Sequence, residues 1–222
     1  HFSIYDLSIE PGTLFYSKKN NGELNLPDED IAADSMRLTN NFLSKKGFSR
    51  YEISNYSLPC HASRHNRVYW SGSGWWAFGQ GATSSPWGER FTRPRTFFGY
   101  KKWVEKESNK SIHLSFNEIS SKGLDFEDQL IVGLRKREGI DFKSFERIMG
   151  WTSIQCNYYI ESFTFSLKDQ ISDRLLIKNG CRFYLANPLG MELSNQVLVQ
   201  AILWWESISK DSSFQRSKSQ EP

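Results

Sequence analysis

The dipeptide Asn179-Gly180 constrains the fold of this chain most strongly, because Asn-Gly is the strongest short signal for a tight β-hairpin turn. Residues rich in apolar and β-strand-forming side chains flank it and predict short strands over 175–178 and 182–185. Helical periodicity recurs on both sides of the hairpin, over 127–137, 142–149, 153–163 and 193–208. Helices, a hairpin and a final helix in this order predict a small winged-helix-like domain.

The first part of the chain has a different pattern. β-Branched and aromatic residues over 2–9 and over 48–56 predict two strands. Between them, Leu26-Pro27-Asp28-Glu29-Asp30 opens a helix, because proline suits the first turn and carboxylates complement the positive end of the helix dipole. Gly47 is the predicted cap at its end. A strand, a helix and a strand favour a parallel sheet, and hence an α/β fold.

A further short strand over 76–78 and a helix over 98–107 follow. The polar residues after that helix predict a linker over 108–116, which separates an α/β part at 1–107 from the winged-helix-like part at 117–208. Residues 209–222 are polar and predict a disordered tail. Because no element leads into the first strand, we expect the chain to be the C-terminal part of a larger protein.

Composition limits the classes of protein to consider. Hydrophobic residues make up 38% of the 222 residues, which is enough to bury a real core. No apolar run approaches the roughly 20 residues that span a bilayer, so we predict a soluble protein. The net charge of +3 is too small to indicate nucleic-acid binding by itself. The three cysteines are odd in number and far apart, which favours a reducing compartment over a disulfide framework.

The segment from Arg64 to Trp70 carries the most chemistry, because it places His65 beside Tyr69 and Trp70. A neutral imidazole is a good iron ligand, and the aromatic side chains suit the edge of a flat cofactor. The alternative is a structural histidine, hydrogen-bonded in a loop beneath aromatic core residues. A zinc site of Cys60, His61 and His65 is a weaker alternative, because no fourth ligand is evident and Pro59 disfavours a helix there.

The glycine-rich run that follows, Gly79-Gln80-Gly81-Ala82, lacks β-carbons at two positions, which lets a ligand approach the backbone. Glycine at the end of a strand also commonly does no more than permit a tight turn. Both interpretations carry equal weight here.

Several motifs in one order resemble the radical S-adenosylmethionine family of oxygen-independent coproporphyrinogen III oxidases. Within that family, the His-Asn-x-x-Tyr-Trp pattern at His65 is similar to the HemW-type heme chaperone branch. The resemblance rests on residues 1–13, 26–30, 51–56, 65–70, 133–135 and 138–141.

The resemblance implies the C-terminal part of a partial (β/α) barrel, here 1–107, followed by the family's C-terminal domain at 117–208. It also implies a [4Fe–4S] cluster on a Cys-x-x-x-Cys-x-x-Cys loop and S-adenosylmethionine as cofactors of the parent protein. This chain has no such loop, so we predict that the chain by itself does not cleave adenosylmethionine. The implied borders of the adenosylmethionine pocket are Ser8, Gly79, Gly81, Ala82 and Thr83.

The implied function is that of a heme-handling protein, which takes heme and passes it to an acceptor protein. His65 would ligate the heme iron, with Asn66, Tyr69 and Trp70 around it and Arg64 or Arg67 at a propionate. The alternative is a true oxidase that decarboxylates coproporphyrinogen III, but the His65 pattern favours the chaperone. Cytosol, mitochondrion and plastid are all compatible with the sequence.

Nucleic-acid binding is a further alternative, since tryptophans beside arginines can stack on bases and some winged helices bind DNA. The candidate recognition helix over 153–163 contains no arginine or lysine. We therefore expect Trp75, Trp76, Trp204 and Trp205 to be core or interface residues, and no nucleic-acid partner.

Overall fold

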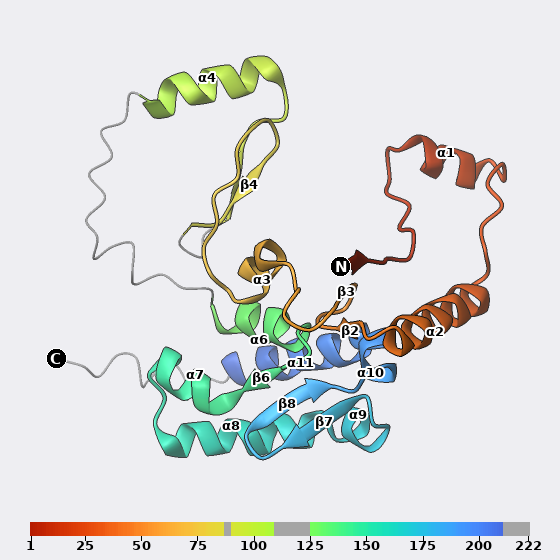
Figure 1. Ribbon diagram of the computed structural model, residues 1–222. Coiled ribbons are helices and arrows are strands. Elements are labelled where there is room, and N and C mark those ends of the chain that lie inside the picture. Colours follow the sequence, from red (N-terminus) through yellow and green to blue (C-terminus); the bar gives the residue numbers. More distant parts are fainter. Residues whose placement is uncertain (87–89, 109–124, 211–222) are drawn as a thin grey trace. The chain divides into compact units, whose positions relative to one another are not determined.

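The computed structural model describes residues 1–86, 90–108 and 125–210 (Figure 1). It divides into two units, His1–Ser63 and Arg64–Pro222. Among the described residues, none of the helices has the length and the apolar content that crossing a membrane requires. The predicted linker at 108–116 and tail at 209–222 fall almost entirely outside the described residues, so the domain boundaries stay predictions.

The first unit combines two helices with a small sheet whose strand order is β1-β3-β2. Its elements are β1 (Phe2–Ser3), α1 (Leu14–Asn20), α2 (Glu29–Lys45), β2 (Ser49–Arg50) and β3 (Asn55–Ser57). The predicted helix is confirmed as α2. It begins where the Asp28 carboxylate accepts a hydrogen bond from the Ile31 amide at 2.8 Å. Gly47 follows its end with φ +82°, a left-handed conformation that favours glycine.

The predicted parallel pairing in this unit is wrong, because the single strand expected over 48–56 is broken into two. The Glu52 carboxylate accepts a hydrogen bond from the Ser54 amide at 3.0 Å, and the Arg50 guanidinium donates to the Ile53 carbonyl. These contacts hold a turn, so β2 and β3 form an antiparallel hairpin. The strand β1 then pairs with β3 antiparallel, with Phe2 opposite Tyr56.

The second unit opens with α3 (Arg64–Trp70), the hairpin β4 (Thr83–Ser84) and β5 (Phe91–Thr92), and α4 (Phe97–Ser108). The predicted helix over 98–107 is confirmed as α4. The strand expected over 76–78 is wrong, because that stretch is irregular and the strand follows the glycines instead. Trp75 makes only an isolated bridge to Ser85.

The rest of the second unit consists of helices and a three-stranded antiparallel sheet of order β6-β8-β7 (Figure 1). The predicted hairpin at Asn179-Gly180 is confirmed, with Gly180 at φ +60°. The elements are α6 (Phe126–Leu134), β6 (Ile140–Asp141), α7 (Phe142–Met149), α8 (Ser153–Ser166), α9 (Lys168–Ser172), β7 (Leu176–Asn179), β8 (Arg182–Leu185), α10 (Leu189–Glu192) and α11 (Ser194–Ser209).

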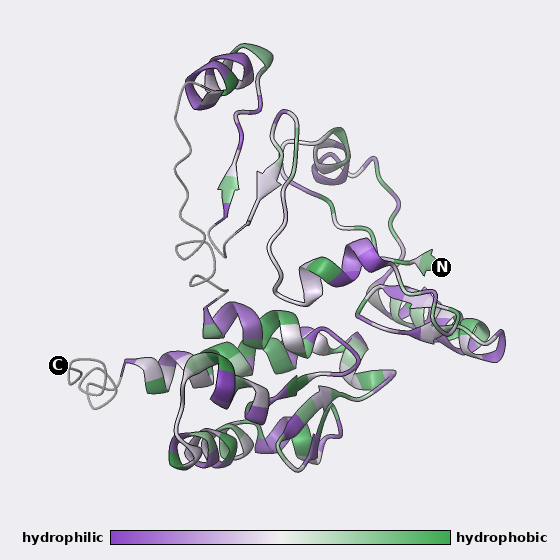
Figure 2. Ribbon diagram, turned by 60° about the vertical axis from the view of Figure 1, so that its left-hand side comes forward, coloured by the Kyte–Doolittle hydropathy of each residue, from purple (hydrophilic) through white to green (hydrophobic). Residues whose placement is uncertain are grey.

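The core of this region is aromatic. Phe142 is fully buried and packs edge to face against Phe183 and Trp204, with ring centroids 5.5 and 6.1 Å apart. Trp204 is buried as expected, and its indole N–H donates to the Ser162 hydroxyl at 3.0 Å. Figure 2 shows apolar residues along the helices that surround this core. In contrast, the first unit buries only three apolar side chains, those of Leu43, Tyr51 and Tyr56.

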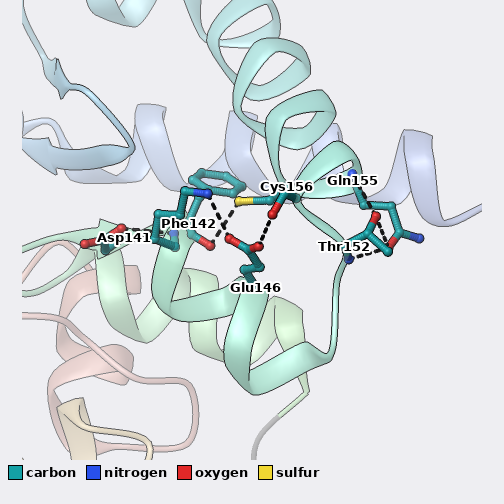
Figure 3. A network of polar contacts seen from close by, with 8 residues as sticks. Asp141, Phe142, Glu146, Thr152, Gln155 and Cys156 are labelled. Atoms are coloured by element: carbon teal, nitrogen blue, oxygen red, sulfur yellow. Dashed lines mark hydrogen bonds and ion pairs between the residues drawn. The ribbon is translucent and has the colours of Figure 1, made fainter.

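Polar contacts fix the start of α8 against α7 (Figure 3). The Thr152 hydroxyl accepts a hydrogen bond from the Gln155 backbone N–H at 3.2 Å. In return, the Gln155 side-chain oxygen accepts one from the Thr152 backbone N–H at 2.8 Å. This reciprocal pair is a capping box. The Glu146 carboxylate accepts from the Ser153 hydroxyl at 2.6 Å and from the Lys143 ammonium at 3.0 Å. These contacts set the angle at which α8 leaves α7.

Candidate functional site

His65 lies near the start of the short helix α3 and is exposed. One helical turn later, the Tyr69 hydroxyl lies 3.2 Å from His65 Nε2, and the two rings meet edge to face with centroids 5.1 Å apart. The sequence left the local structure here open, since a loop belonged to only one of the alternatives, the structural histidine. The helix places His65 and Tyr69 on one face and lets the hydroxyl orient the imidazole.

Tyr69 also connects α3 to the next segment of the chain. Its ring packs edge to face on Trp75, with centroids 4.9 Å apart. The Trp75 indole N–H donates to the Thr83 carbonyl at 3.1 Å, and the Trp75 backbone pairs with Ser85. A row of three rings, His65, Tyr69 and Trp75, therefore links the candidate ligand to strand β4.

Trp70 and Asn66 lie on a different face of α3. Each is half-buried, and they are separated by one helical turn. The Arg135 guanidinium lies 6.0 Å from the centre of the Trp70 ring, so Trp70 faces the end of α6. The structure thus divides the four residues predicted at a heme between two faces of the same short helix.

The nearby arginines differ in their surroundings. Arg67 pairs with Glu138 at 2.6 Å, and both side chains are about half exposed. A propionate at Arg67 would therefore compete with Glu138 for the guanidinium. Arg64, at the beginning of the helix, is exposed.

The glycine-rich turn has a structural reason for its glycines. Gly79 and Gly81 have φ values of +101° and +67°. The Gly81 amide donates to the Pro94 carbonyl at 3.1 Å, and the Ala82 amide donates to the Gly79 carbonyl at 3.3 Å. Thr83 continues into β4, where its hydroxyl lies 2.7 Å from that of Thr92. The conformation thus requires the glycines whether or not a ligand approaches.

The sequence analysis did not single out Arg93, which follows β5 directly. Arg93 is only 4% exposed. Its guanidinium donates to the Ser84 hydroxyl at 2.7 Å and lies 5.4 and 5.0 Å from the ring centres of Phe91 and Trp103. The charge is therefore held by a hydroxyl and aromatic faces, and it fastens the β4–β5 hairpin to α4. The aromatic residues around Arg93 were the available signal.

Ser8 does not lie on a strand, because the strand expected over 2–9 covers only Phe2–Ser3. It is exposed and lines a hollow of about 310 Å³ in the first unit with residues of the start of α1. The glycine turn belongs to the other unit. The assignment of Ser8 and of Gly79, Gly81, Ala82 and Thr83 to an adenosylmethionine pocket stays a prediction.

The cysteines do not form a metal site. Cys60 is exposed, Cys156 is buried and Cys181 is half-buried. Within the described ranges, no three His, Cys, Asp or Glu side chains come close enough together to hold a metal ion. The residues present therefore do not fit a [4Fe–4S] cluster, and the zinc alternative at Cys60, His61 and His65 has no support. His61 Nδ1 instead lies 2.7 Å from the Pro59 carbonyl.

A cavity of about 270 Å³ lies beside the end of α3, and no sequence signal pointed to it. Trp70 lines it together with Lys136, from the turn after α6, and Arg182, from β8. Burial lowers the pKa of Lys136, with Glu138 acting in the opposite direction and Arg67 and Arg182 reinforcing the shift. Trp70 therefore lines the same cavity as a partly desolvated cation.

Comparison with known proteins places this geometry in context. The chain is 31% identical over 207 residues to the Synechocystis sp. heme chaperone HemW. The aligned region covers 89% of this chain and 50% of that protein. The chain is also 31% identical over 206 residues to HemW of Lactococcus lactis, and this alignment covers 91% of this chain and 50% of that protein. A mitochondrial radical S-adenosyl methionine domain-containing protein 1 of Danio rerio is 29% identical over 66% of this chain and 34% of that protein. The chain thus spans about half the length of the two HemW proteins that it matches.

The fold is also similar to a solved structure, the radical SAM enzyme coproporphyrinogen III oxidase (HemN) of Escherichia coli. The TM-score is 0.53 at 14% sequence identity, over 79% of this chain and 42% of that one. This similarity confirms the expected fold class. No family model matches the chain.

Proposed function

We propose that this chain, which belongs to the radical SAM coproporphyrinogen oxidase-like family, binds heme through His65 and passes it to an acceptor protein. Within the family, the chain is similar to the HemW heme chaperones. The observation that carries the proposal is an exposed imidazole oriented by a tyrosine hydroxyl. An exposed histidine with one ring nitrogen already engaged is the arrangement that metal-ligating histidines usually have.

The tautomer decides which nitrogen binds. With the proton on Nε2, His65 donates to the Tyr69 hydroxyl and Nδ1 keeps a lone pair for iron. Tyr69 then acts as a positioning residue, since it fixes the plane of the imidazole ring. Bound heme would supply the iron that this lone pair ligates.

The other predicted heme residues take supporting roles in this proposal. Trp70 offers an aromatic wall at the end of α3, and Asn66 is a polar group on the same face. Arg64 is exposed beside His65, so it is the arginine placed to meet a propionate without displacing Glu138 from Arg67.

Adenosylmethionine and a [4Fe–4S] cluster belong to the full-length protein in this proposal. The cysteines of this chain do not fit the cluster, so no step is assigned to it here. In this proposal, Gly79, Gly81, Ala82 and Thr83 would contact adenosylmethionine through backbone shape, and Ser8 is proposed separately as a contact from the first unit.

A heme titration followed by transfer tests the proposed function. We expect a saturable Soret shift when heme is added to the chain, because an imidazole–iron bond changes the heme spectrum. Apomyoglobin added afterwards should acquire the heme faster from the chain than from free heme in buffer. A folded chain that gives no saturable shift would contradict heme binding, and a shift without transfer would contradict the chaperone role.

The oxidase alternative makes a different prediction. A true oxidase would convert coproporphyrinogen III to its decarboxylated product when the full-length protein is supplied with adenosylmethionine and a reductant. We expect no such turnover, since the candidate residues of this chain suit iron ligation. Product detected by chromatography would favour the oxidase.

A further inference from the structure

The cavity beside α3 is large enough for one substituent of a ligand, but it is too small to enclose a drug-sized molecule. Its volume of about 270 Å³ lies below the roughly 300–1,000 Å³ of pockets that enclose drug-sized molecules. Trp70, Val132, Phe145 and Ile148 supply apolar wall, and Lys136 and Arg182 supply positive charge. Such a lining suits a charged group on an apolar body.

The charges around the cavity are unevenly paired. The Asp141 carboxylate pairs with Arg182 at 3.2 Å, and the Glu138 carboxylate pairs with Arg67 at 2.6 Å. Each carboxylate thus already has a guanidinium partner. Within the described part of the chain, Lys136 forms no ion pair, and Glu138, which already pairs with Arg67, is the opposite charge that acts on it. The cations Arg67, Arg182 and Lys136 thus outnumber the carboxylates Glu138 and Asp141 by one.

Burial makes this imbalance costly. Lys136 is half-buried, and desolvation is the largest cause of its lowered pKa, reinforced by Arg67 and Arg182. An ammonium in this position gains more from a bound anion than a solvated lysine does, because the anion replaces lost hydration. The site therefore favours a ligand that carries negative charge.

The charge count also limits the ligand. Glu138 and Asp141 line the same cavity as Lys136. One uncompensated cation matches a single negative charge, whereas a dianionic phosphate would meet repulsion from the two carboxylates. A carboxylate is the monoanion that fits.

We propose that this cavity binds a carboxylate carried on an apolar body, with Lys136 as the ion-pair partner and Trp70 as part of the apolar wall. The carboxylate has two possible sources. One is a propionate arm of a heme held on α3, and this source rests on the proposed function. The other is a small free carboxylate that binds independently of heme.

The position of the cavity is compatible with the first source. Trp70 follows His65 by five residues, which is about 7.5 Å along a helix axis. Because Trp70 lies on a different face of α3 from His65, a flat ligand on His65 would have to extend around the helix as well as along it to bring a propionate arm to the cavity.

Acylation of Lys136, followed by mass spectrometry, tests the site directly. The probe is 3-phenylpropionate, and its methyl ester is the uncharged control. We expect ten dissociation constants of the acid to slow acylation of Lys136 about tenfold, and the ester to have no effect. Lys143 is the internal control, because it is exposed, lies outside the cavity and pairs with Glu146.

Two variants provide a matched comparison. Lys136→Gln should weaken 3-phenylpropionate binding, measured by calorimetry, about tenfold. Arg137→Gln removes the same charge from the next residue, which is exposed and does not line the cavity, and should leave binding unchanged. Circular dichroism establishes that both variants are folded.

The outcomes separate the two sources and the two proposals. Protection of Lys136 by heme, but not by heme dimethyl ester, assigns the cavity to a propionate arm. Protection by 3-phenylpropionate alone assigns it to a free carboxylate, even if the chain binds no heme and the proposed function fails. Equal protection by acid and ester, no protection by any carboxylate, or equal losses in Lys136→Gln and Arg137→Gln would overturn the carboxylate site.

Discussion

We expect His65→Ala to abolish the axial-ligand contribution to the Soret spectrum of the heme-bound chain, if His65 ligates the iron as proposed. The expected loss of heme affinity exceeds the 10–100-fold that removing a partner of a metal ligand typically costs, because here the ligand itself is removed. His65 is exposed, so the substitution leaves no cavity in the core and should not change the folded state. Absorbance titration of both proteins measures the effect, with circular dichroism as the test of folding.

Two variants make this result specific to His65. His61→Ala removes another exposed histidine whose Nδ1 contacts the Pro59 carbonyl, and should leave the spectrum unchanged. Tyr69→Phe keeps the ring that packs on Trp75 but removes the hydroxyl beside His65 Nε2, and should weaken heme binding about 10–100-fold. An unaltered Soret shift in folded His65→Ala would mean that His65 has a structural role only.

Gly139→Ala should destabilise the second unit by about 3 kcal/mol or more. Gly139 has φ +69°, which an alanine adopts only at a cost, and an added β-carbon would collide with the Phe183 carbonyl and with Tyr184. Because these atoms are backbone and inner side chain of β8, the strand must move, and with it the pairing of Ile140 with Phe183. Urea denaturation followed by circular dichroism measures the change.

The matched control is Gly150→Ala. Gly150 has nearly the same backbone conformation, with φ +67°, but no atom lies within 4 Å of an added β-carbon. This variant should lose only the cost of the left-handed conformation, about 1–2 kcal/mol. Equal losses in the two variants would show that close approach to β8 does not contribute.

The helices and the long hairpin could be predicted from the sequence because their signals are local. The helix α7 was predicted with its bounds at Phe142 and Met149, and the Asn179-Gly180 turn sets the pairing of β7 with β8. The turn between β2 and β3 was missed because it depends on side-chain contacts of Arg50 and Glu52 with the backbone. No periodicity reports such contacts.

The candidate site was predicted less completely than the fold. The sequence singled out His65 and Tyr69 but not their orientation, since the helix α3 has only seven residues and follows a proline-containing turn. Lys136 was missed because its environment is assembled from segments distant in sequence, whereas the partners of Arg93 in β4, β5 and α4 lie within ten residues of it but surround it only once these elements have folded. Arg93 is buried by aromatic residues of β5 and α4, and Lys136 is desolvated beside Trp70 and Arg182.

The unequal cores of the two units have a consequence for how the chain opens. Helices α8 and α11 pack on a dense aromatic core, so we expect their amide protons to exchange with solvent only when the whole second core unfolds. The first unit buries three apolar side chains, so its amides can exchange through small local openings that leave the other core intact. We therefore expect hydrogen exchange to be slow in the core of the second unit and faster in the first unit, with cooperative unfolding confined to the former.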